Sequence, residues 1–470
     1  MSGKNKPQPV IANVPVVDIA DDGRAVGKSP EGVIFVPHAV PGDIADIRIV
    51  RKRKNYAEGL VVRFEKYSEW RVAPVCCEFS VCGGCKWQHF SYERQLFYKQ
   101  KNVSDCLTRI GKLEIPEIRP IIPADAIYYY RNKLEFSFSS DRWLTEEEIR
   151  AGGEPASRHA LGFHIPSKFD KILNIRQCFL QADPSNAIRT AVREFSMKEG
   201  MPYFHLRTHE GFLRTLVIRN SSVGEIMVIV IFHYENTALR EKLLDFIQKA
   251  FPEITSLMYV INPKPNDSFA DLEAHLYKGR KYITEEMEGL KFRISPKSFY
   301  QTNSQQAYRL YRTVRELAGL TGTETVYDLY TGTGTIANFV AAQAGKVVGV
   351  ESVPEAVEDA KQNSLLNGID NTCFFAGDMK DVFHPDFIRQ HGTPDTVILD
   401  PPRAGVHPKV IEALLFARPQ RIVYVSCNPA SQARDLSLLQ EHYTVGAVQP
   451  VDMFPHTHHV ENIVMLQKNT

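Results

Sequence analysis

The stretch TVYDLYTGTGTIANFVAAQAGKVVGVE occupies residues 325–351. It is typical of a buried strand, a glycine-containing turn, an apolar helix and a second strand. The same alternation continues through PEAVEDAKQNSLLN, TVILD with PKVIEALLFA, and RIVYVS with ASQARDLSLLQ. Alternating strands and helices indicate a doubly wound parallel sheet with helices on both faces. The sequence therefore predicts an α/β, Rossmann-like domain over residues 291–470.

The two preceding parts of the chain have different patterns. Residues 9–69 contain short strand-like segments such as VIANVPVVDIA and AEGLVVRFEK, separated by glycine and proline turns. Regularly spaced short strands predict a small β-barrel, either a scaffold without a ligand or an OB-like barrel that binds oligonucleotides. Residues 70–290 mix strands such as EIMVIVIFHY with helices, which predicts a mixed α+β domain.

A helix is expected over residues 93–112, between the barrel and the mixed domain. Leu96, Val103, Leu107 and Ile110 share one face of it, and Gly111 ends it. We expect this apolar face to pack on the C-terminal domain.

Composition excludes several classes of protein. The chain has 470 residues, which is enough for several domains, and its longest apolar runs are far too short to cross a bilayer. Its first residues, MSGKNKPQPV, lack a secretory signal, and eight cysteines are too few for a disulfide scaffold of this size. We therefore expect a cytoplasmic protein with reduced thiols and no membrane partner.

Net charge gives no general attraction to nucleic acid. The formal charge is +1, so a nucleic-acid partner must be held by local basic patches. Arg51, Lys52, Arg53 and Lys54 form one such run. A solvated sheet edge is the alternative interpretation of that run.

The glycine turn after the first strand of the α/β domain predicts a ligand site. Gly332 and Gly334 allow backbone to approach a ligand before a helix begins, at the edge where such sheets bind their ligands. The dinucleotide pattern G-x-G-x-x-G is incomplete, because Ala337 stands at its third glycine.

Acidic residues around this turn favour a cationic nucleoside. Asp328 precedes the turn, Glu351 ends the second strand 23 residues later, and Asp378 ends the third strand. A carboxylate at the second strand accepts hydrogen bonds from a ribose diol, whereas a cluster of carboxylates repels a pyrophosphate. S-adenosylmethionine, with its sulfonium and ammonium groups, is therefore favoured over a nicotinamide cofactor.

A thiol is expected beside this ligand. The fourth strand ends at Asp400 in LDPPRAG and the fifth at Cys427 in VSCNP, so both emerge at the ligand edge of the sheet. A thiolate that adds to carbon 6 of a pyrimidine makes carbon 5 nucleophilic enough to take a sulfonium methyl. A base must then remove the proton from carbon 5. Glu461, which follows His458 and His459 at the start of the last strand, is the candidate base.

Three cysteines near the front have the spacing of a metal site. Cys76, Cys82 and Cys85 form C-x5-C-x2-C, and a fourth ligand must come from Cys77, Cys106 or Cys178. Cys77 adjoins Cys76 and does not easily reach another corner, and Cys106 lies in the predicted amphipathic helix. Four thiolates hold either zinc or an iron–sulfur cluster, and the spacing does not decide between them.

The order of the motifs resembles one enzyme family. FYQTN at 299–303, then DLYTGTG, LDPPRAG, VSCNPA and HHVEN, follow the order seen in the RNA uracil-C5-methyltransferases. Together with the P-x-C-x5-CGGC motif, the chain is similar to the branch that acts on 23S-type ribosomal RNA of bacteria. The first segment resembles a TRAM domain, which is an RNA-binding barrel.

The resemblance implies roles for individual residues and a substrate. It implies an S-adenosylmethionine-dependent enzyme that methylates carbon 5 of uridine in 23S ribosomal RNA, with no obligate protein partner evident. By this resemblance the S-adenosylmethionine site is lined by Gln301, Tyr330, Thr335, Glu351 and Asp378. Asp400 would lie between cofactor and uracil, Cys427 would be the nucleophile and Glu461 the base. Cys178 matches the fourth cysteine ligand, and the resemblance favours a four-iron four-sulfur (4Fe-4S) cluster over zinc.

Three other functions compete with this one. DPP at 400–402 is similar to the loop with which amino-group methyltransferases grip an exocyclic amine, but Arg403 stands where those enzymes have an aromatic residue. A transfer RNA uracil-C5-methyltransferase is a second alternative. A non-catalytic RNA-binding or redox factor is a third, and the set of Asp400, Cys427 and Glu461 argues against it.

Overall fold

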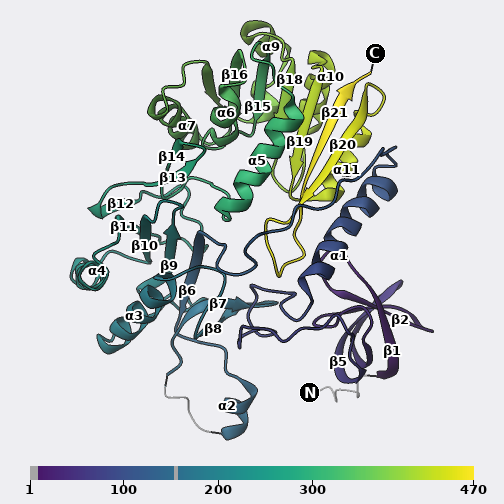
Figure 1. The fold of residues 1–470 in the computed structure, drawn as a ribbon. Helices are drawn as coiled ribbons and strands as arrows, with labels where there is room; N and C mark the ends of the chain where they lie inside the picture. Colours follow the sequence, from purple (N-terminus) through teal and green to yellow (C-terminus); the bar gives the residue numbers. More distant parts are fainter. Residues whose placement is uncertain (1–8, 153–156, 470) are drawn as a thin grey trace.

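The computed structural model describes residues 9–152 and 157–469. Their strands form a closed barrel, a seven-stranded mixed sheet, a two-stranded hairpin and a second seven-stranded sheet. Figure 1 shows the barrel and the second large sheet at opposite ends of one edge, with helix α1 (Tyr92–Asp105) between them. The predicted α/β class and barrel are both present.

The barrel forms because side chains alternate between its inside and outside. Its strands pair in the order β1-β2-β3-β5-β4, and Val14, Val16, Ile34 and Ile47 fill its interior. The strands are β1 (Val10–Ile19), β2 (Ala25–Ser29), β3 (Gly32–Val36), β4 (Ile44–Lys52) and β5 (Tyr56–Lys66). The basic run 51–54 lies at the end of β4 and in the turn after it, fully exposed, with Lys52 paired to Glu31 at 3.0 Å.

Helix α1 contacts the C-terminal part through its last turns. It continues as a π-helical turn, η1 (Cys106–Ile110), and Val103, Cys106 and Leu107 are buried in the same core as the C-terminal strands. Ile110, expected on that face, is 51% exposed. A π turn takes more residues per turn than an α-helix, so it rotates Ile110 away from the stripe that Val103 and Leu107 share.

The middle of the chain is a mixed sheet in the order β12-β11-β10-β9-β6-β7-β8. Its neighbours pair antiparallel except β10 and β11. Helices α3 and α4 pack together through Phe195 and Phe246, whose rings stack 4.0 Å apart. The elements are β6 (Lys133–Ser139), α2 (Glu146–Ala151), β7 (Ala160–Ile165), β8 (Lys168–Leu173), α3 (Ser185–Lys198), β9 (Leu213–Asn220), β10 (Ile226–Phe232), α4 (Thr237–Ala250), β11 (Ser256–Ile261) and β12 (His275–Gly279).

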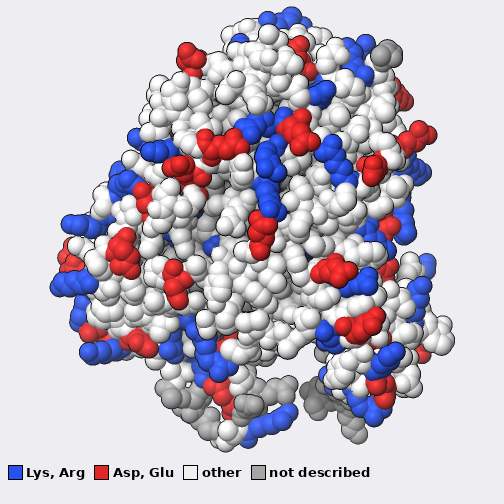
Figure 2. All heavy atoms as spheres, viewed as in Figure 1, with Lys and Arg blue, Asp and Glu red and all other residues white. Residues whose placement is uncertain are grey.

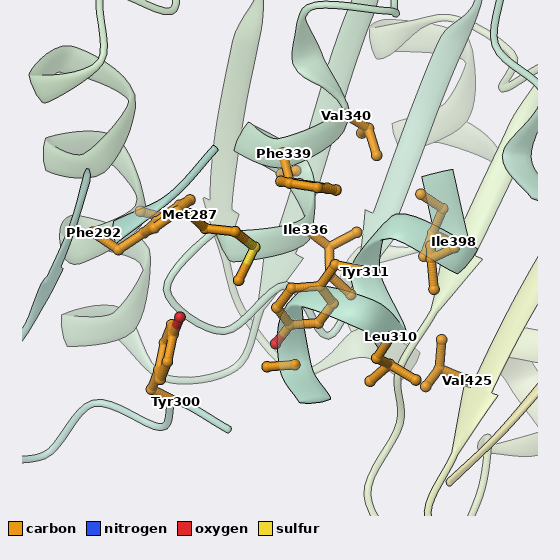
Figure 3. Close-up of a cluster of buried hydrophobic side chains, with 14 of the residues drawn as sticks. Met287, Phe292, Tyr300, Leu310, Tyr311, Ile336, Phe339, Val340, Ile398 and Val425 are labelled. Atoms are coloured by element: carbon orange, nitrogen blue, oxygen red, sulfur yellow. The ribbon is translucent and has the colours of Figure 1, made fainter. Parts of the chain in front are cut away.

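A hairpin of β13 (Ile283–Met287) and β14 (Leu290–Ile294) follows. Met287 and Phe292 from this hairpin lie in one buried cluster with Phe339 of the C-terminal part (Figure 3). The domain boundary expected at residue 290 therefore falls inside this hairpin.

The C-terminal sheet has the order β17-β16-β15-β18-β19-β21-β20, with β15 to β19 parallel and the last two strands antiparallel. The order reverses at β15, which lies between β16 and β18 and so creates a switch point. The strands are β15 (Thr325–Leu329), β16 (Lys346–Glu351), β17 (Thr372–Ala376), β18 (Thr396–Leu399), β19 (Arg421–Ser426), β20 (Tyr443–Val451) and β21 (Glu461–Lys468).

Both faces of this sheet are covered by helices. Alternate strand residues point to opposite faces, so Val326 and Ile398 join one core and Tyr327 and Val397 join the other. The first face packs α5 (Ser304–Ala318), α6 (Thr335–Ala341) and α7 (Pro354–Leu366). The second packs α8 (Met379–Val382), α9 (Pro385–His391), α10 (Pro408–Ala417) and α11 (Pro429–Ser437).

None of the helices in the described ranges is long and apolar enough to span a membrane.

Candidate active site

A cavity of about 890 Å³ opens at the carboxyl ends of β15, β16, β18 and β19. This is the edge at which open α/β sheets bind ligands, and the volume suits a small molecule with part of a second one. Nine of the residues expected from the sequence line it: Gln301, Tyr330, Gly332, Thr335, Glu351, Asp378, Asp400, Cys427 and Glu461.

The glycine turn forms one wall of the cavity. Tyr330 and Gly332 have φ values of 67° and 56°, and the space where a Cβ of Gly332 would stand is open. Gly334 does not line the cavity. It begins α6 at φ 72°, and a Cβ there would lie 2.8 Å from Ala360, so this glycine serves helix packing rather than ligand contact.

The acid at the end of β16 is fixed by backbone groups. Glu351 accepts hydrogen bonds from the N–H of Gly332 at 3.1 Å and of Val353 at 3.0 Å. It thereby joins the glycine turn to the second strand. Its placement at the cavity wall suits the ribose contact that the sequence predicts.

Asp378 occupies a different position from the one expected. Strand β17 ends at Ala376, and Asp378 is the N-cap of α8, where it accepts the N–H of Lys380 at 3.2 Å. Hydrogen bonds from Lys380 lower the pKa of Asp378. Gly377, at φ 155°, separates the strand from the helix.

Two further acids lie at the ends of β15 and β18: Asp328 is buried, and Asp400 is half-buried. Burial raises the pKa of Asp328 to about 7, and this side chain does not line the cavity. It accepts the N–H of Ala337 at 3.0 Å and a hydroxyl from Thr331, so it shapes the glycine turn. Asp400 does line the cavity, and burial together with Asp328 raises its pKa to about 7.

Strand register places Cys427 opposite Glu461. Strands β19 and β21 pair antiparallel, with Ser426 opposite Asn462. The next residue on β19 is Cys427 and the preceding one on β21 is Glu461, so directly opposite residues of this ladder would be about 5 Å apart at Cα. A thiol and a carboxyl from sequence positions 34 apart thus meet at one corner of the cavity.

Burial keeps both groups protonated in the free protein. The pKa of the Cys427 thiol is raised to about 11, first by burial and then by the neighbouring Glu461 carboxyl. Burial and Asp400 raise the pKa of Glu461 well above its usual range. A carboxylate with a raised pKa is a stronger base, which suits proton removal from carbon.

Several residues that line the cavity were not predicted as site residues, and three of them bear on the chemistry. Phe299, from FYQTN, lines the cavity although its side chain is 67% exposed. Arg403 and His459 also line it, and Arg403 Nη2 donates to His459 Nδ1 at 2.8 Å. Phe299 could have been found from the sequence, because it is a large aromatic residue in the FYQTN motif that also contains the predicted Gln301. The Arg403–His459 contact could not, because it joins residues 56 positions apart.

The four predicted cysteine ligands surround a second, smaller cavity. Cys76, Cys82, Cys85 and Cys178 line a space of about 120 Å³, and Cys77 and Cys106 do not. The N–H of Gly84 donates to Cys82 Sγ at 3.4 Å. Burial raises the pKa of Cys82 to about 12 and of Cys85 to about 11, so these thiols are neutral unless a cation binds.

The thiols are not closed around an ion. In the described part of the chain, no three His, Cys, Asp or Glu side chains are arranged to hold a metal ion. The expected 4Fe-4S cluster is therefore not supported by the side-chain geometry. The donor set is nevertheless of the right kind for such a group, because four cysteines line one cavity and a backbone N–H donates to one of their sulfurs.

Comparison with known proteins identifies the parts of the chain. The family described as tRNA (Uracil-5-)-methyltransferase matches residues 275–469, and the TRAM domain family matches residues 11–62. An uncharacterized RNA methyltransferase of Porphyromonas gingivalis is 58% identical and covers 97% of this chain and 99% of its own. One of Chlorobaculum tepidum is 38% identical over 97% and 96% of the two chains.

A solved structure agrees over the whole length. The Pyrococcus abyssi tRNA (uracil-54, C5)-methyltransferase, in complex with S-adenosyl-L-homocysteine, is 29% identical with a TM-score of 0.74. The match covers 97% of this chain and 100% of that one. The chain belongs to the S-adenosylmethionine-dependent RNA (uracil-5-)-methyltransferase family.

Proposed function

We propose that this protein methylates carbon 5 of a uridine in 23S-type ribosomal RNA through a transient bond between Cys427 and carbon 6 of the base. The observation that carries the proposal is the pairing of Ser426 with Asn462, which sets Cys427 opposite Glu461. Both residues line the same cavity as the glycine turn. The proposed nucleophile, the proposed base and the glycine turn of the proposed methyl-donor site all line this one cavity.

The residues of the large cavity fit S-adenosylmethionine. Glu351 would bind the ribose, the Tyr330–Gly332 turn would approach the nucleoside, and Asp378 would lie beside the adenine. Asp400 and Gln301 would hold the cationic end next to the uracil. When bound, S-adenosylmethionine supplies an electrophilic methyl group.

Cys427 begins the reaction. Its thiol loses a proton to solvent, and the sulfur then forms a bond to carbon 6 of uracil. The electron pair of the carbon 5–carbon 6 double bond moves toward carbon 5 and the carbon 4 carbonyl. Carbon 5 can then take the methyl group. Asp400, between the two binding regions, would keep the methyl donor and the ring in line.

Glu461 ends the reaction. Glu461 first loses its own proton to solvent; once carbon 5 carries both a proton and the methyl group, the Glu461 carboxylate takes the proton from carbon 5. The electrons of the broken C–H bond restore the double bond, the bond from sulfur to carbon 6 breaks, and the thiolate of Cys427 leaves. The raised pKa of Glu461 favours its acceptance of this proton.

Two features of the chain bear on which RNA is the substrate. The Cys76–Cys85 motif resembles that of the branch acting on ribosomal RNA. A second candidate is transfer RNA, which is favoured by the match to the Pyrococcus abyssi enzyme. That match spans both chains, so domain composition does not separate the two substrates. On the face in Figure 2, Lys and Arg are interspersed with Asp and Glu, which gives no long single-sign track for either RNA.

One experiment tests both the chemistry and the RNA. The purified protein is incubated with labelled S-adenosylmethionine and either unmodified 23S ribosomal RNA or unmodified bulk transfer RNA, and nucleosides are analysed by mass spectrometry. We expect 5-methyluridine in ribosomal RNA. Label confined to transfer RNA would select the second candidate, and label on an exocyclic amine would overturn the proposed chemistry.

RNA containing 5-fluorouridine tests the covalent step. Fluorine cannot leave carbon 5 as a cation, so Glu461 has no proton to remove and the bond to Cys427 persists. We expect a protein–RNA adduct that survives denaturation and maps to the Cys427 peptide. Labelled product without any adduct would contradict the mechanism.

We further propose that Cys76, Cys82, Cys85 and Cys178 bind a 4Fe-4S cluster, with zinc as the alternative. The shared cavity and the N–H of Gly84 near Cys82 support this proposal. Because all four ligands would be protein thiolates, the cluster would stabilise the middle of the chain rather than react. Anaerobic purification with iron, sulfide and zinc analysis and a visible absorption spectrum tests it. Stoichiometric zinc, or neither metal, would refute the cluster.

A further inference from the structure

Arg403 is tied to the turn that carries the proposed nucleophile. Its carbonyl oxygen accepts hydrogen bonds from Asn428 Nδ2 at 3.0 Å and from Ser431 Oγ at 3.1 Å. Asn428 directly follows Cys427 and is the N-cap of α11. The backbone of Arg403 therefore has a fixed position relative to Cys427 before any substrate binds.

The guanidinium of Arg403 reaches the other side of the same corner. Its Nη2 donates to His459 Nδ1 at 2.8 Å, two residues before Glu461. No Asp or Glu of the described residues lies within ion-pair distance of Arg403. The guanidinium belongs to a residue that lines the same cavity as Cys427, and its positive charge opposes the rise in the pKa of that thiol. This positive charge acts on both the Cys427 thiol and the Glu461 carboxyl.

The other influences on Cys427 oppose its ionisation. The charged groups that act on this thiol are Glu461 from β21, and Asp400 and Arg403 from the turn after β18. Burial and the two acids raise the pKa of Cys427, and Arg403 is the cation among them that lowers it. A nucleophilic thiolate at this corner therefore depends on Arg403.

His459 can hold the guanidinium because it is neutral. Its pKa is lowered to about 4, first by burial and then by nearby cations, which are Arg403, Lys86, Lys99 and Arg131. An arginine can only donate, so His459 Nδ1 must be an acceptor and the ring proton must be on Nε2. The partner of Arg403 thus stays an acceptor across the physiological pH range.

The barrel contacts His459 indirectly, through His458. The ring of His459 lies 4.0 Å from that of His458, and His458 packs against Gly23 in the turn after β1. A Cβ on Gly23 would lie 2.7 Å from His458 Cβ, so the barrel turn leaves no room for His458 to move back. The barrel turn therefore contacts the side chain whose ring packs on that of His459.

We propose that Arg403 is a further catalytic residue, which stabilises the Cys427 thiolate once the thiol proton has left, and that His459 is a positioning residue that orients the guanidinium toward the sulfur. This inference rests on the proposed function, in which Cys427 is the nucleophile. No bond to carbon forms in this step. The thiol proton passes to solvent, and the negative charge left on sulfur faces the guanidinium.

The test follows the alkylation of Cys427 without RNA. Protein is treated with iodoacetamide between pH 6 and 10, and the Cys427 peptide is quantified by mass spectrometry. Arg403 is solvent-exposed, which moderates its field. We therefore expect Arg403→Gln to move the profile upward by about one pH unit and to slow alkylation at pH 8 about tenfold. Lys409→Gln, which removes an exposed cation at the start of α10, leaves the profile unchanged.

Arg403→Lys and two substitutions at His459 separate the effect of the positive charge from the effect of its orientation. Lysine retains the charge without the planar fork, so we expect a smaller shift than with glutamine. His459→Asn keeps an acceptor for the guanidinium and stays near wild type, whereas His459→Leu shifts the profile in the direction of Arg403→Gln. Binding of S-adenosylhomocysteine by each variant serves as the check of folding.

The outcomes distinguish this inference from the proposed function. An unchanged Cys427 profile in Arg403→Gln, with 5-methyluridine still formed through a Cys427 adduct, overturns the role of Arg403 alone. A shifted profile in a protein that methylates an amine would leave Arg403 as the activator of the thiol and remove the proposed reaction. Equal shifts in His459→Asn and His459→Leu would overturn the positioning role.

Discussion

Two regions of this molecule bury cysteine thiols, and they differ in what surrounds the sulfur. Around the 120 Å³ cavity, Cys82 and Cys85 face other thiols in an enclosed space. At the 890 Å³ cavity, Cys427 stands at a strand end beside a carboxyl and a guanidinium. Burial raises the pKa of the thiols in both regions. The chemistry of a cysteine is therefore set by which charged groups reach it and by whether a second molecule has room to approach.

Removing the proposed nucleophile of the larger cavity should have the largest effect, and it should act on the rate of methyl transfer. We expect Cys427→Ala to lower single-turnover methyl transfer by about three orders of magnitude or more, because no other group adds to carbon 6. Affinity for S-adenosylhomocysteine, measured by calorimetry, should stay within about threefold. Cys373→Ala on β17 is the matched control and should keep full activity. An amino-group methyltransferase would instead retain most of its rate in Cys427→Ala.

Changing the base should have the next largest effect. Glu461→Gln keeps the shape of the side chain but cannot take the proton from carbon 5, so we expect turnover to fall about 10²- to 10⁴-fold. The methylated RNA should stay attached to Cys427 and migrate with the protein on a denaturing gel. Free methylated RNA at the wild-type rate would show that another group is the base.

The smaller cavity should respond in stability rather than in rate. If four thiolates bind a cluster, Cys82→Ser should remove it and lower the free energy of unfolding by about 3 kcal/mol, or Tm by roughly 10 °C. Cys77→Ser, one residue from Cys76 but outside the cavity, should change Tm by less than about 1 °C. Equal thermal scans for the two variants would remove the structural role of the four cysteines.

The smallest expected effect is a pH dependence of ligand affinity at the larger cavity. The pKa of Asp400 is raised to about 7, so this carboxyl is mostly neutral at pH 6 and mostly ionised at pH 8. Ionisation favours a sulfonium, so affinity for S-adenosylmethionine relative to S-adenosylhomocysteine should rise about threefold over that interval. Asp400→Asn should flatten the ratio. Because both ligands carry the same amino and carboxyl groups, the ratio isolates the sulfonium; a flat ratio in the wild type would contradict the role of Asp400.

The sequence predicted what local patterns encode. Strand–helix alternation located β15, β16, β18 and β19, and strand ends located Cys427 and Asp400 at the cavity. It did not encode departures from ideal geometry: a π turn exposes Ile110, and β17 ends at Ala376, two residues before Asp378.

Contacts between distant segments were beyond sequence patterns. Gly334 looked like a ligand-contacting glycine, but its neighbours Ala360 and Phe374 come from other elements. The sequence distinguished Arg403 only as the residue that stands where amino-group methyltransferases have an aromatic one. Its contact with His459 depends on the sheet order, in which β18 and β21 lie on either side of β19. No periodicity of strands or helices reports which loops meet above a sheet.

The register between β19 and β21 has a consequence for how such enzymes diversify. Because Ser426 faces Asn462, the two chemical groups are spaced by ladder hydrogen bonds, not by the segments that meet the RNA. If Cys427 and Glu461 react as proposed, substitutions in surface loops and in the barrel would leave the separation of this pair unchanged. The choice of RNA and the geometry of the reaction would then depend on different parts of the same chain.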